Sequence, residues 1–278
     1  ECEAIDASGL WLIPGWIDLQ VNDIEWFARG PKPPAEHASR IREVAAYQAA
    51  RGVTGLVLAT LAAPLDEVVA YLEGMKMVLA SRLVPADAAF LGGLVEGTFM
   101  NPALCGAQNP AWVVKPDLRT LDRLLDTGAV KLINIAPETS PEATDLIAHA
   151  TRRGAVVGAG HAKPHAERLR EAVRAGLRYA IHLGNGPTGS SLKAFHDGGM
   201  LEESLRNDDL IATIILDGHH VHPSLARDWI ARKEVSRVIA VSDAGFAMGV
   251  PRGDFEVFGI HGALSGDGRY LRVLPREG

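Results

Sequence analysis

The sequence predicts an α/β fold, a (β/α)₈ barrel, on three observations. Eight short, mostly continuous apolar runs are expected to be strands, because such runs are typical of parallel strands buried on both faces. Helical patterns lie between many of these runs. Four short polar motifs stand at the ends of apolar runs, which is where the active sites of such barrels form. We expect the barrel to span residues 8–255.

The strands and helices are expected to alternate along the chain. A doubly wound open sheet is the alternative, but it would need a glycine-rich phosphate-binding turn after an early strand, and no GxGxxG motif occurs there. The predicted strands are residues 16–20, 55–59, 90–96, 130–135, 155–160, 179–182, 210–216 and 237–243, and the predicted helices are residues 35–51, 64–82, 118–127, 141–153, 163–175 and 223–233.

Helix ends are also expected from local signals. Ser140 followed by Pro141 predicts an N-cap with proline at the first helical position. Four glycines, each just before a predicted strand, are expected to end helices. After Asp243 the sequence has strand and turn character, and a covering helix for the last strand is not expected. The glycines are Gly52, Gly128, Gly154 and Gly176.

Composition excludes several classes of protein. The 278 residues are 47% hydrophobic and 22% charged, which is normal for a globular enzyme. The formal net charge of -6 and the absence of a Lys/Arg block argue against nucleic-acid binding. No apolar run reaches about 18 residues, so no membrane span is expected. Only two cysteines and no signal-peptide pattern lead us to expect a cytoplasmic protein.

Three of the polar motifs could together hold a metal ion. The motif VEG contains Glu96, GAGH ends at His161 and IHLGN contains His182. Each of these residues lies at the end of a predicted strand. A hydrolytic divalent-metal site needs about three protein ligands and an open position for water. Strand ends converge around one axis in a barrel, so these three side chains are predicted to share one ion.

Two further residues are candidates for proton transfer and substrate polarisation. Asp243, in VSDA, ends the last predicted strand, and a carboxylate near a metal-bound water can take its proton and pass it to a leaving group. Asp217-Gly218-His219-His220 ends the seventh strand. One imidazole there could stabilise an oxyanion. His220 is favoured, although spacing alone does not choose it.

At these motifs the chain resembles N-acetylglucosamine-6-phosphate deacetylases of the amidohydrolase superfamily. The resemblance runs nearly end to end, through DASGLWLIPGWIDLQVND, GLVEGTFMNPALCGAQNP, VKLINIAPE, VVGAGHA, IHLGNGP, IILDGHHVH and VIAVSDAGFAMG in the family's order. It implies a metal-dependent barrel with a small β-sandwich, of which residues 1–7 and 256–278 would be remnants. It also implies removal of an acetyl group from a phosphorylated amino sugar, and a homodimer.

Position by position, the resemblance implies a role for each motif residue. Glu96, His161 and His182 match the metal ligands, Asp243 the catalytic aspartate and His220 the substrate-polarising histidine. The family's Gln-x-Asn form at the first strand uses a single metal, so one divalent ion, zinc or a similar cation, is implied. The substrate-binding positions would be Asn185, Gly186, Gln108, Asn109 and His220, and the Gln-x-Asn pair would be Gln20 and Asn22.

The expected reaction is amide hydrolysis, and two alternatives stay open. Thr98 replaces the family's proline, Gln108 replaces a histidine directed toward the sugar phosphate, and the arginine after the asparagine loop is not evident. The last two differences keep the first alternative open, another amidohydrolase acting on a different N-acyl or cyclic amide. The second is a catalytically inactive, barrel-shaped binding protein. The set of Glu96, His161, His182 and Asp243 argues against the second, because a binder has no need of all four.

Overall fold

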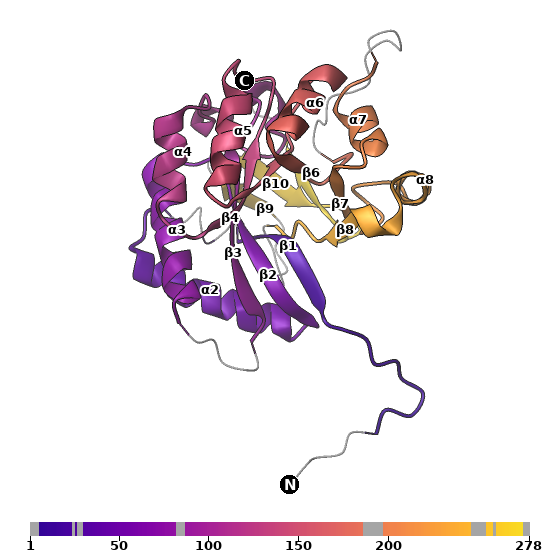
Figure 1. The fold of residues 1–278 in the computed structure, drawn as a ribbon. Helices are drawn as coiled ribbons and strands as arrows, with labels where there is room; N and C mark the ends of the chain where they lie inside the picture. The colour runs from indigo at the N-terminus through magenta and orange to yellow at the C-terminus, as the bar shows by residue number, and fades with distance from the viewer. Residues whose placement is uncertain are drawn as a thin grey trace.

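The computed structural model describes residues 6–23, 26, 30–81, 87–185, 197–245, 254–257 and 260–274. Its centre is one parallel sheet of eight strands whose spatial order follows the sequence (Figure 1). The strands are β1 (Trp16–Asn22), β2 (Val53–Thr60), β3 (Ala89–Phe99), β4 (Val130–Ile135), β5 (Val156–Ala159), β6 (Leu177–Ala180), β7 (Ile211–Ile215) and β8 (Val238–Val241).

The sheet is curled so that its first and last strands meet. Val21 and Ala244 form an isolated parallel bridge, and the amide of Asn22 donates to the carbonyl oxygen of Ala244 at 2.7 Å. The sequential strand order excludes the doubly wound alternative, in which the order reverses within the sheet. The carboxyl ends of all eight parallel strands therefore lie along the same rim.

Helices connect the successive parallel strands and cover the outside of the sheet (Figure 1). Among the described residues, the short 3₁₀ turns η1 (Pro102–Leu104), η2 (Pro110–Trp112) and η4 (Val235–Arg237) lie in the connections. The helices are α2 (Pro34–Ala49), α3 (Leu65–Leu79), α4 (Leu118–Leu125), α5 (Ala143–Arg152), α6 (Ala166–Ala175), α7 (Met200–Arg206) and α8 (Pro223–Lys233).

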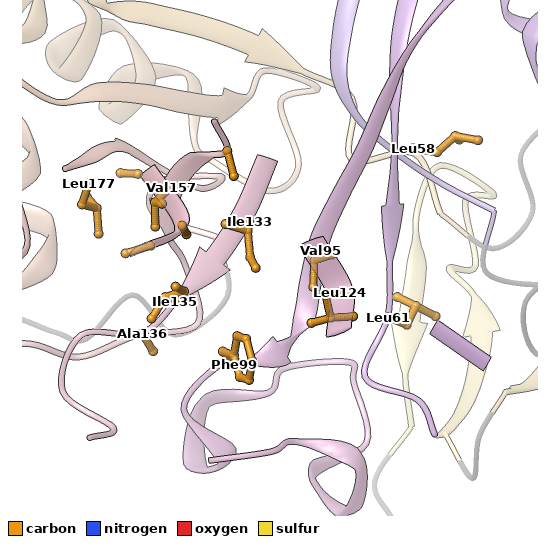
Figure 2. Packing of buried hydrophobic residues seen from close by; sticks show 14 of the residues in the cluster. Leu58, Leu61, Val95, Phe99, Leu124, Ile133, Ile135, Ala136, Val157 and Leu177 are labelled. Carbon is orange, nitrogen blue, oxygen red and sulfur yellow. The ribbon is translucent and has the colours of Figure 1, made fainter. Parts of the chain in front are cut away.

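The two faces of the strands have different partners because successive side chains alternate. Leu58, Val95 and Ile133 belong to the large core cluster between sheet and helices, which Figure 2 shows together with Leu124 of α4. Their sequence neighbours Val57 and Leu94 belong to a separate, smaller cluster. The continuous apolar runs in the sequence are thus explained by strands buried on both faces.

The predicted elements agree with the structure, with two corrections. The predicted N-cap at Ser140 is wrong: α5 begins at Ala143, and the Ser140 hydroxyl instead accepts the amide of Glu142 at 3.3 Å. Helix α7 was not predicted, because its seven residues, MLEESLR, are too short for a clear helical period. The helix-ending glycines are confirmed by positive φ angles of 82° at Gly52, 76° at Gly128, 90° at Gly154 and 123° at Gly176.

Beyond β8, the described residues include three further strands. β9 (Asp254–Val257), β10 (Ile260–Leu264) and β11 (Leu271–Val273) make a three-stranded antiparallel sheet, as the strand and turn character of this region predicts. At the other end, the segment before β1 extends away from the sheet (Figure 1), with Trp11 93% exposed. Over the described ranges, the helices are too short or too polar to cross a lipid bilayer.

Candidate metal centre

Glu96, His161 and His182 come together at the carboxyl rim of the sheet, as predicted. Their ligand atoms all lie within 4.8 Å of one another, and the three residues are 3%, 6% and 2% exposed. Oε1 of Glu96 is 2.9 Å from Nε2 of His182 and 3.5 Å from Nε2 of His161. One carboxylate and two imidazoles, buried and convergent, form a donor set that fits a divalent cation such as zinc.

The other ring nitrogen of each histidine is held by a backbone carbonyl. Nδ1 of His161 lies 2.8 Å from the oxygen of Leu104, and Nδ1 of His182 lies 3.1 Å from the oxygen of Asn185. A carbonyl oxygen can only accept, so each Nδ1 carries the hydrogen and each Nε2 keeps its lone pair in the neutral ring. Such outer contacts orient the histidines as metal ligands.

Three predicted site residues share an unusual backbone conformation. His161, His182 and Asp243 have φ angles of 48°, 31° and 47°. Only two other non-glycine residues in the described part of the chain, Asp197 and Glu234, have positive φ. This conformation costs on the order of 1–3 kcal/mol per residue and persists where the surroundings enforce it, typically at functional sites. It turns each side chain inward directly after its strand.

Asn134 of β4 connects the strands that carry Glu96 and His161. It is fully buried, its Nδ2 donates to the carbonyl oxygen of Glu96 at 3.0 Å, and its Oδ1 accepts the amide of Gly160 at 2.9 Å. Gly160 has no room for a side chain, since a Cβ there would lie 2.6 Å from Cβ of Ile181. One amide group therefore sets the spacing of two ligand-bearing strands.

Thr213 of β7 holds the third ligand. The amide of His182 donates to its hydroxyl oxygen at 2.7 Å, and the hydroxyl donates to the carbonyl of Ala180 at 3.2 Å. The roles of Asn134 and Thr213 were missed in the sequence. The available signal was a polar residue near the end of each apolar run, Asn134 in VKLINI and Thr213 in IATII, because a buried polar group needs a partner.

The site concentrates negative charge that favours a bound cation. Burial raises the pKa of Glu96, but the hydrogen bonds and charges of His161 and His182 outweigh it and hold the pKa well below its usual range. Burial lowers the pKa of His182, yet its hydrogen bond to Glu96 and the charge of Asp243 raise it to about 9. A cation at Nε2 must displace this proton, so binding is expected to weaken at low pH.

Asp243 lies beside this cluster, across the seam between β8 and β1. Its Oδ1 accepts a hydrogen bond from Nδ2 of Asn22 at 2.7 Å. Burial first, and the charge of Glu96 second, raise the pKa of Asp243 to about 6. Oδ1 of Asn22 is buried and has no hydrogen-bond partner. The other member of the Gln-x-Asn pair, Gln20, donates from Nε2 to Oε1 of Glu96 at 2.8 Å.

The remaining predicted site residues have varied surroundings. Nδ1 of His220 lies 2.7 Å from Oδ2 of Asp217, and its side chain is 41% exposed. Asn109 caps η2, its Oδ1 accepting the amide of Ala111 at 3.0 Å. Gln108 is buried, and its Nε2 donates to Oε2 of Glu96 at 3.0 Å. Gly186 lies outside the described residues.

Fold and site together define an α/β protein with a candidate divalent-metal centre, and comparison with known proteins identifies similar proteins. No family model matches the chain. The N-acetylglucosamine-6-phosphate deacetylase of Lysinibacillus sphaericus is 25% identical, covering 95% of this chain and 67% of the relative. That of Vibrio furnissii is 29% identical, covering 91% and 61%. N-acetylgalactosamine-6-phosphate deacetylase of Escherichia coli O157:H7 is 26% identical, covering 91% and 66%.

Solved structures agree with this result at the level of the fold. N-acetyl-D-glucosamine-6-phosphate deacetylase from Mycobacterium smegmatis, in complex with N-acetyl-D-glucosamine-6-phosphate, has a TM-score of 0.77 at 20% identity, covering 95% of this chain and 66% of that one. The Thermotoga maritima enzyme gives 0.74 at 20% identity, covering 92% and 68%. The resemblance stated from the motifs is confirmed. The chain spans about two thirds of the length of these relatives.

Proposed function

We propose that the chain is a metal-dependent hydrolase that removes the acetyl group from N-acetylglucosamine-6-phosphate. The observation that carries this proposal is the buried convergence of Glu96, His161 and His182, with Asp243 beside them. The names of the relatives, all of them deacetylases of amino-sugar 6-phosphates, supply the substrate class. They favour this function over a different amide substrate or an inactive binding protein.

Glu96, His161 and His182 would hold one divalent ion, and zinc is proposed because it prefers one carboxylate and two imidazoles with an open fourth position. Such an ion supplies Lewis acidity, which lowers the pKa of a coordinated water to about 7. The protein's part is to direct both Nε2 atoms at the ion and to hold Glu96 ionised. Because the pKa of His182 is raised to about 9, an arriving ion displaces the proton from its Nε2.

Asp243 is proposed to move the proton. Its raised pKa, about 6, makes its carboxylate a better base than an ordinary aspartate and its acid form usable near neutral pH. It can therefore accept a proton from water and return it to the leaving amine. The hydrogen bond from Asn22 fixes the carboxylate that does this. His220, oriented through Nδ1 by Asp217, is proposed to polarise the acetyl carbonyl.

The architecture supports finer proposals as well. We infer a closed (β/α)₈ barrel over residues 8–255 and remnants of a β-sandwich at residues 1–7 and 256–278, supported by the β1–β8 bridge and by the sheet of β9, β10 and β11. Asn185, Gly186, Gln108 and Asn109 remain predicted substrate contacts. A homodimer and a cytoplasmic location also remain proposals, the latter supported by the low cysteine content.

The test is acetate release by the purified chain, with and without added zinc. The substrates are N-acetylglucosamine-6-phosphate, N-acetylgalactosamine-6-phosphate and the two sugars without phosphate. Zinc-dependent release that is fastest with N-acetylglucosamine-6-phosphate is the expected result. Release only from the sugars without phosphate would favour the alternative amidohydrolase. A chain that binds no metal and releases no acetate would favour the binding protein.

A further inference from the structure

Glu138 ends the motif VKLINIAPE and lies in the connection between β4 and α5, where it is half-buried. Its Oε1 accepts two hydrogen bonds, from Nδ2 of Asn101 at 2.9 Å and from the backbone amide of Lys163 at 2.5 Å. Its Oε2 is buried and has no hydrogen-bond partner among the described residues. One carboxylate oxygen therefore joins the segment that follows β3 to the segment that follows β5.

Both partners of Glu138 lie next to the candidate ligand His161. Lys163 is two residues further along the chain, and the backbone amide of Asn101 donates to the carbonyl oxygen of His161 at 2.9 Å. A closed loop of hydrogen bonds thus runs from His161 through Asn101 and Glu138 to the amide of Lys163. This loop encloses the left-handed turn at His161, whose φ is 48°, and such a conformation persists only where its surroundings enforce it.

Asn101 also controls the group that orients the ring of His161. Its Oδ1 accepts the amide of Ala103 at 3.0 Å and its carbonyl oxygen accepts the amide of Leu104 at 2.8 Å, so it fixes the turn η1. The carbonyl oxygen of Leu104, the last residue of η1, lies 2.8 Å from Nδ1 of His161. By holding the side chain of Asn101, Glu138 therefore acts on the ring of His161 as well as on its backbone.

The other contacts of His161 act on different parts of the residue. Asn134 accepts the amide that directly precedes it, at 2.9 Å, and so fixes the end of the strand. Nε2 of the ring lies 3.5 Å from Oε1 of Glu96, and the ring packs edge-on against His182 with 4.9 Å between the centroids. The turn after His161 and the Nδ1 side of its ring are left to η1 and Glu138.

We propose that Glu138 is a positioning residue that holds His161 in the orientation of a metal ligand. This inference rests on the proposed metal-dependent function. Contacts behind a ligating histidine set the direction of its ring, and their loss typically lowers metal affinity about 10- to 100-fold. The oxygen of Glu138, rather than its charge, is what the hydrogen bonds to Asn101 and Lys163 require.

The test uses the full chain with two variants, Glu138→Ala and Glu138→Gln. Alanine removes the acceptor, whereas glutamine keeps an oxygen that can accept both hydrogen bonds and loses only the charge. Glu203→Ala is the matched control, because Glu203 lies on α7, is 4% exposed and likewise accepts two hydrogen bonds on one oxygen, from Arg170 at 3.0 Å and Arg206 at 2.8 Å.

Two measurements distinguish positioning from a purely structural role. Zinc affinity is obtained by competition with a chromophoric chelator. The visible absorption of the cobalt-loaded chain reports the number and arrangement of ligands around the ion. Thermal unfolding of the metal-free chain shows whether each variant folds. A residue that only stabilises the fold would change the unfolding temperature and leave the cobalt spectrum unaltered.

Zinc affinity is expected to fall by about 10- to 100-fold in Glu138→Ala, with an altered cobalt spectrum, because the ring of His161 is no longer held. Glu138→Gln should keep the wild-type spectrum and stay within about fivefold in affinity, since a neutral acceptor is weaker than a charged one. Glu203→Ala should stay within about twofold, because distant sites act independently. A folded Glu138→Ala with wild-type affinity or spectrum would overturn the inference alone, and so would a Glu138→Gln as impaired as Glu138→Ala.

Should Glu138→Ala fail to fold, Asn101→Asp decides. Aspartate keeps the oxygen that caps η1 but replaces the donor to Glu138 with a second carboxylate oxygen. The same loss of zinc affinity is expected, and wild-type affinity would overturn the inference. A wild-type chain that binds no zinc would overturn the proposed function itself.

Discussion

The strands that carry the three candidate ligands and the seam that carries Asp243 are built differently. Between β3 and β6 the strands pair in parallel ladders, with register shifts in the β3–β4 and β5–β6 pairs, and Asn134 and Thr213 add hydrogen bonds at the ligands themselves. Between β8 and β1 the pairing is reduced to one isolated bridge, Val21 to Ala244. Side-chain hydrogen bonds join the seam instead: Oδ1 of Asp18 accepts the amide of Ser242 at 3.2 Å.

Burial does not distinguish the two regions, because Ile133 of β4 and Val21 of β1 are both fully buried. The difference lies in how the strands are hydrogen-bonded. The candidate metal ligands are therefore positioned by paired strands and by buried hydrogen bonds within the sheet. The proposed proton carrier, Asp243, depends instead on a few side-chain contacts between β8 and β1. Substitutions on the two sides should therefore separate metal binding from turnover.

The largest effect is expected for His182→Ala, which removes one of the three candidate metal ligands. Zinc binding and acetate release should both be lost, because one of three ligands is gone. The metal-free chain should also lose about 3 kcal/mol of unfolding free energy, since Glu96 stays buried without its nearest imidazole. Metal analysis and urea unfolding measure both. His149→Ala, on partly exposed α5, is the control and should keep its zinc; retained zinc in His182→Ala would contradict the assignment.

Asp243→Asn, at the seam between β8 and β1, should reduce turnover without reducing metal binding. Turnover should fall by about 10²- to 10⁴-fold, the usual contribution of general acid–base catalysis. Zinc content should stay unchanged, because Asp243 is not one of the three clustered ligands. Steady-state kinetics with metal content determined on the same sample gives the answer. Turnover near that of the wild type, with zinc bound, would exclude Asp243 as the proton carrier.

The pH profile should sharpen the role of Asp243. Its carboxylate must be ionised to accept a proton, and its pKa is raised to about 6 by burial and by Glu96. Turnover should therefore fall about tenfold per pH unit below its pKa. A bound cation adds positive charge, which lowers this pKa, so the acid limb should lie no higher than about pH 6. An acid limb well above that value would point to a different group.

Asn134→Ala tests the link between the strands that carry Glu96 and His161. It removes the partners of the Glu96 carbonyl and the Gly160 amide, and leaving buried groups unsatisfied costs about 1–3 kcal/mol. Zinc affinity should fall roughly tenfold, since the spacing of two ligand-bearing strands is relaxed. Urea unfolding and chelator competition are the measurements. Unchanged zinc affinity despite lower stability would make Asn134 a structural residue only.

The smallest effect is expected for Ser242→Ala at the seam. The Ser242 hydroxyl lies 3.1 Å from the amide of Ala244 and 3.4 Å from the carbonyl of Gln20, so both contacts are modest. The unfolding free energy should fall by about 0.5–1 kcal/mol. Zinc affinity should not change, because no ligand lies at the seam. A loss of zinc affinity comparable to that of Asn134→Ala would show that the two regions are not independent.

The strands and most helices could be predicted because their signals are local. Continuous apolar runs mark the eight strands, and Gly52, Gly128, Gly154 and Gly176 mark the helix ends through a backbone conformation that glycine adopts without strain. Helix α7 could not be predicted, because its seven residues contain too few turns to show a period. Burial against the rest of the fold, which the sequence does not display, holds it in place.

The sequence by itself determined which residues stand at the strand ends, because a parallel sheet places all its carboxyl ends on one rim, and it thereby determined that Glu96, His161 and His182 would meet. Tertiary structure decided how they are held. The side-chain amide of Asn134 joins Glu96 to Gly160, and the hydroxyl of Thr213 holds the amide of His182, so both contacts link strands that are separate in the sequence. Such contacts form only when the strands pair in the sheet, so no local pattern encodes them.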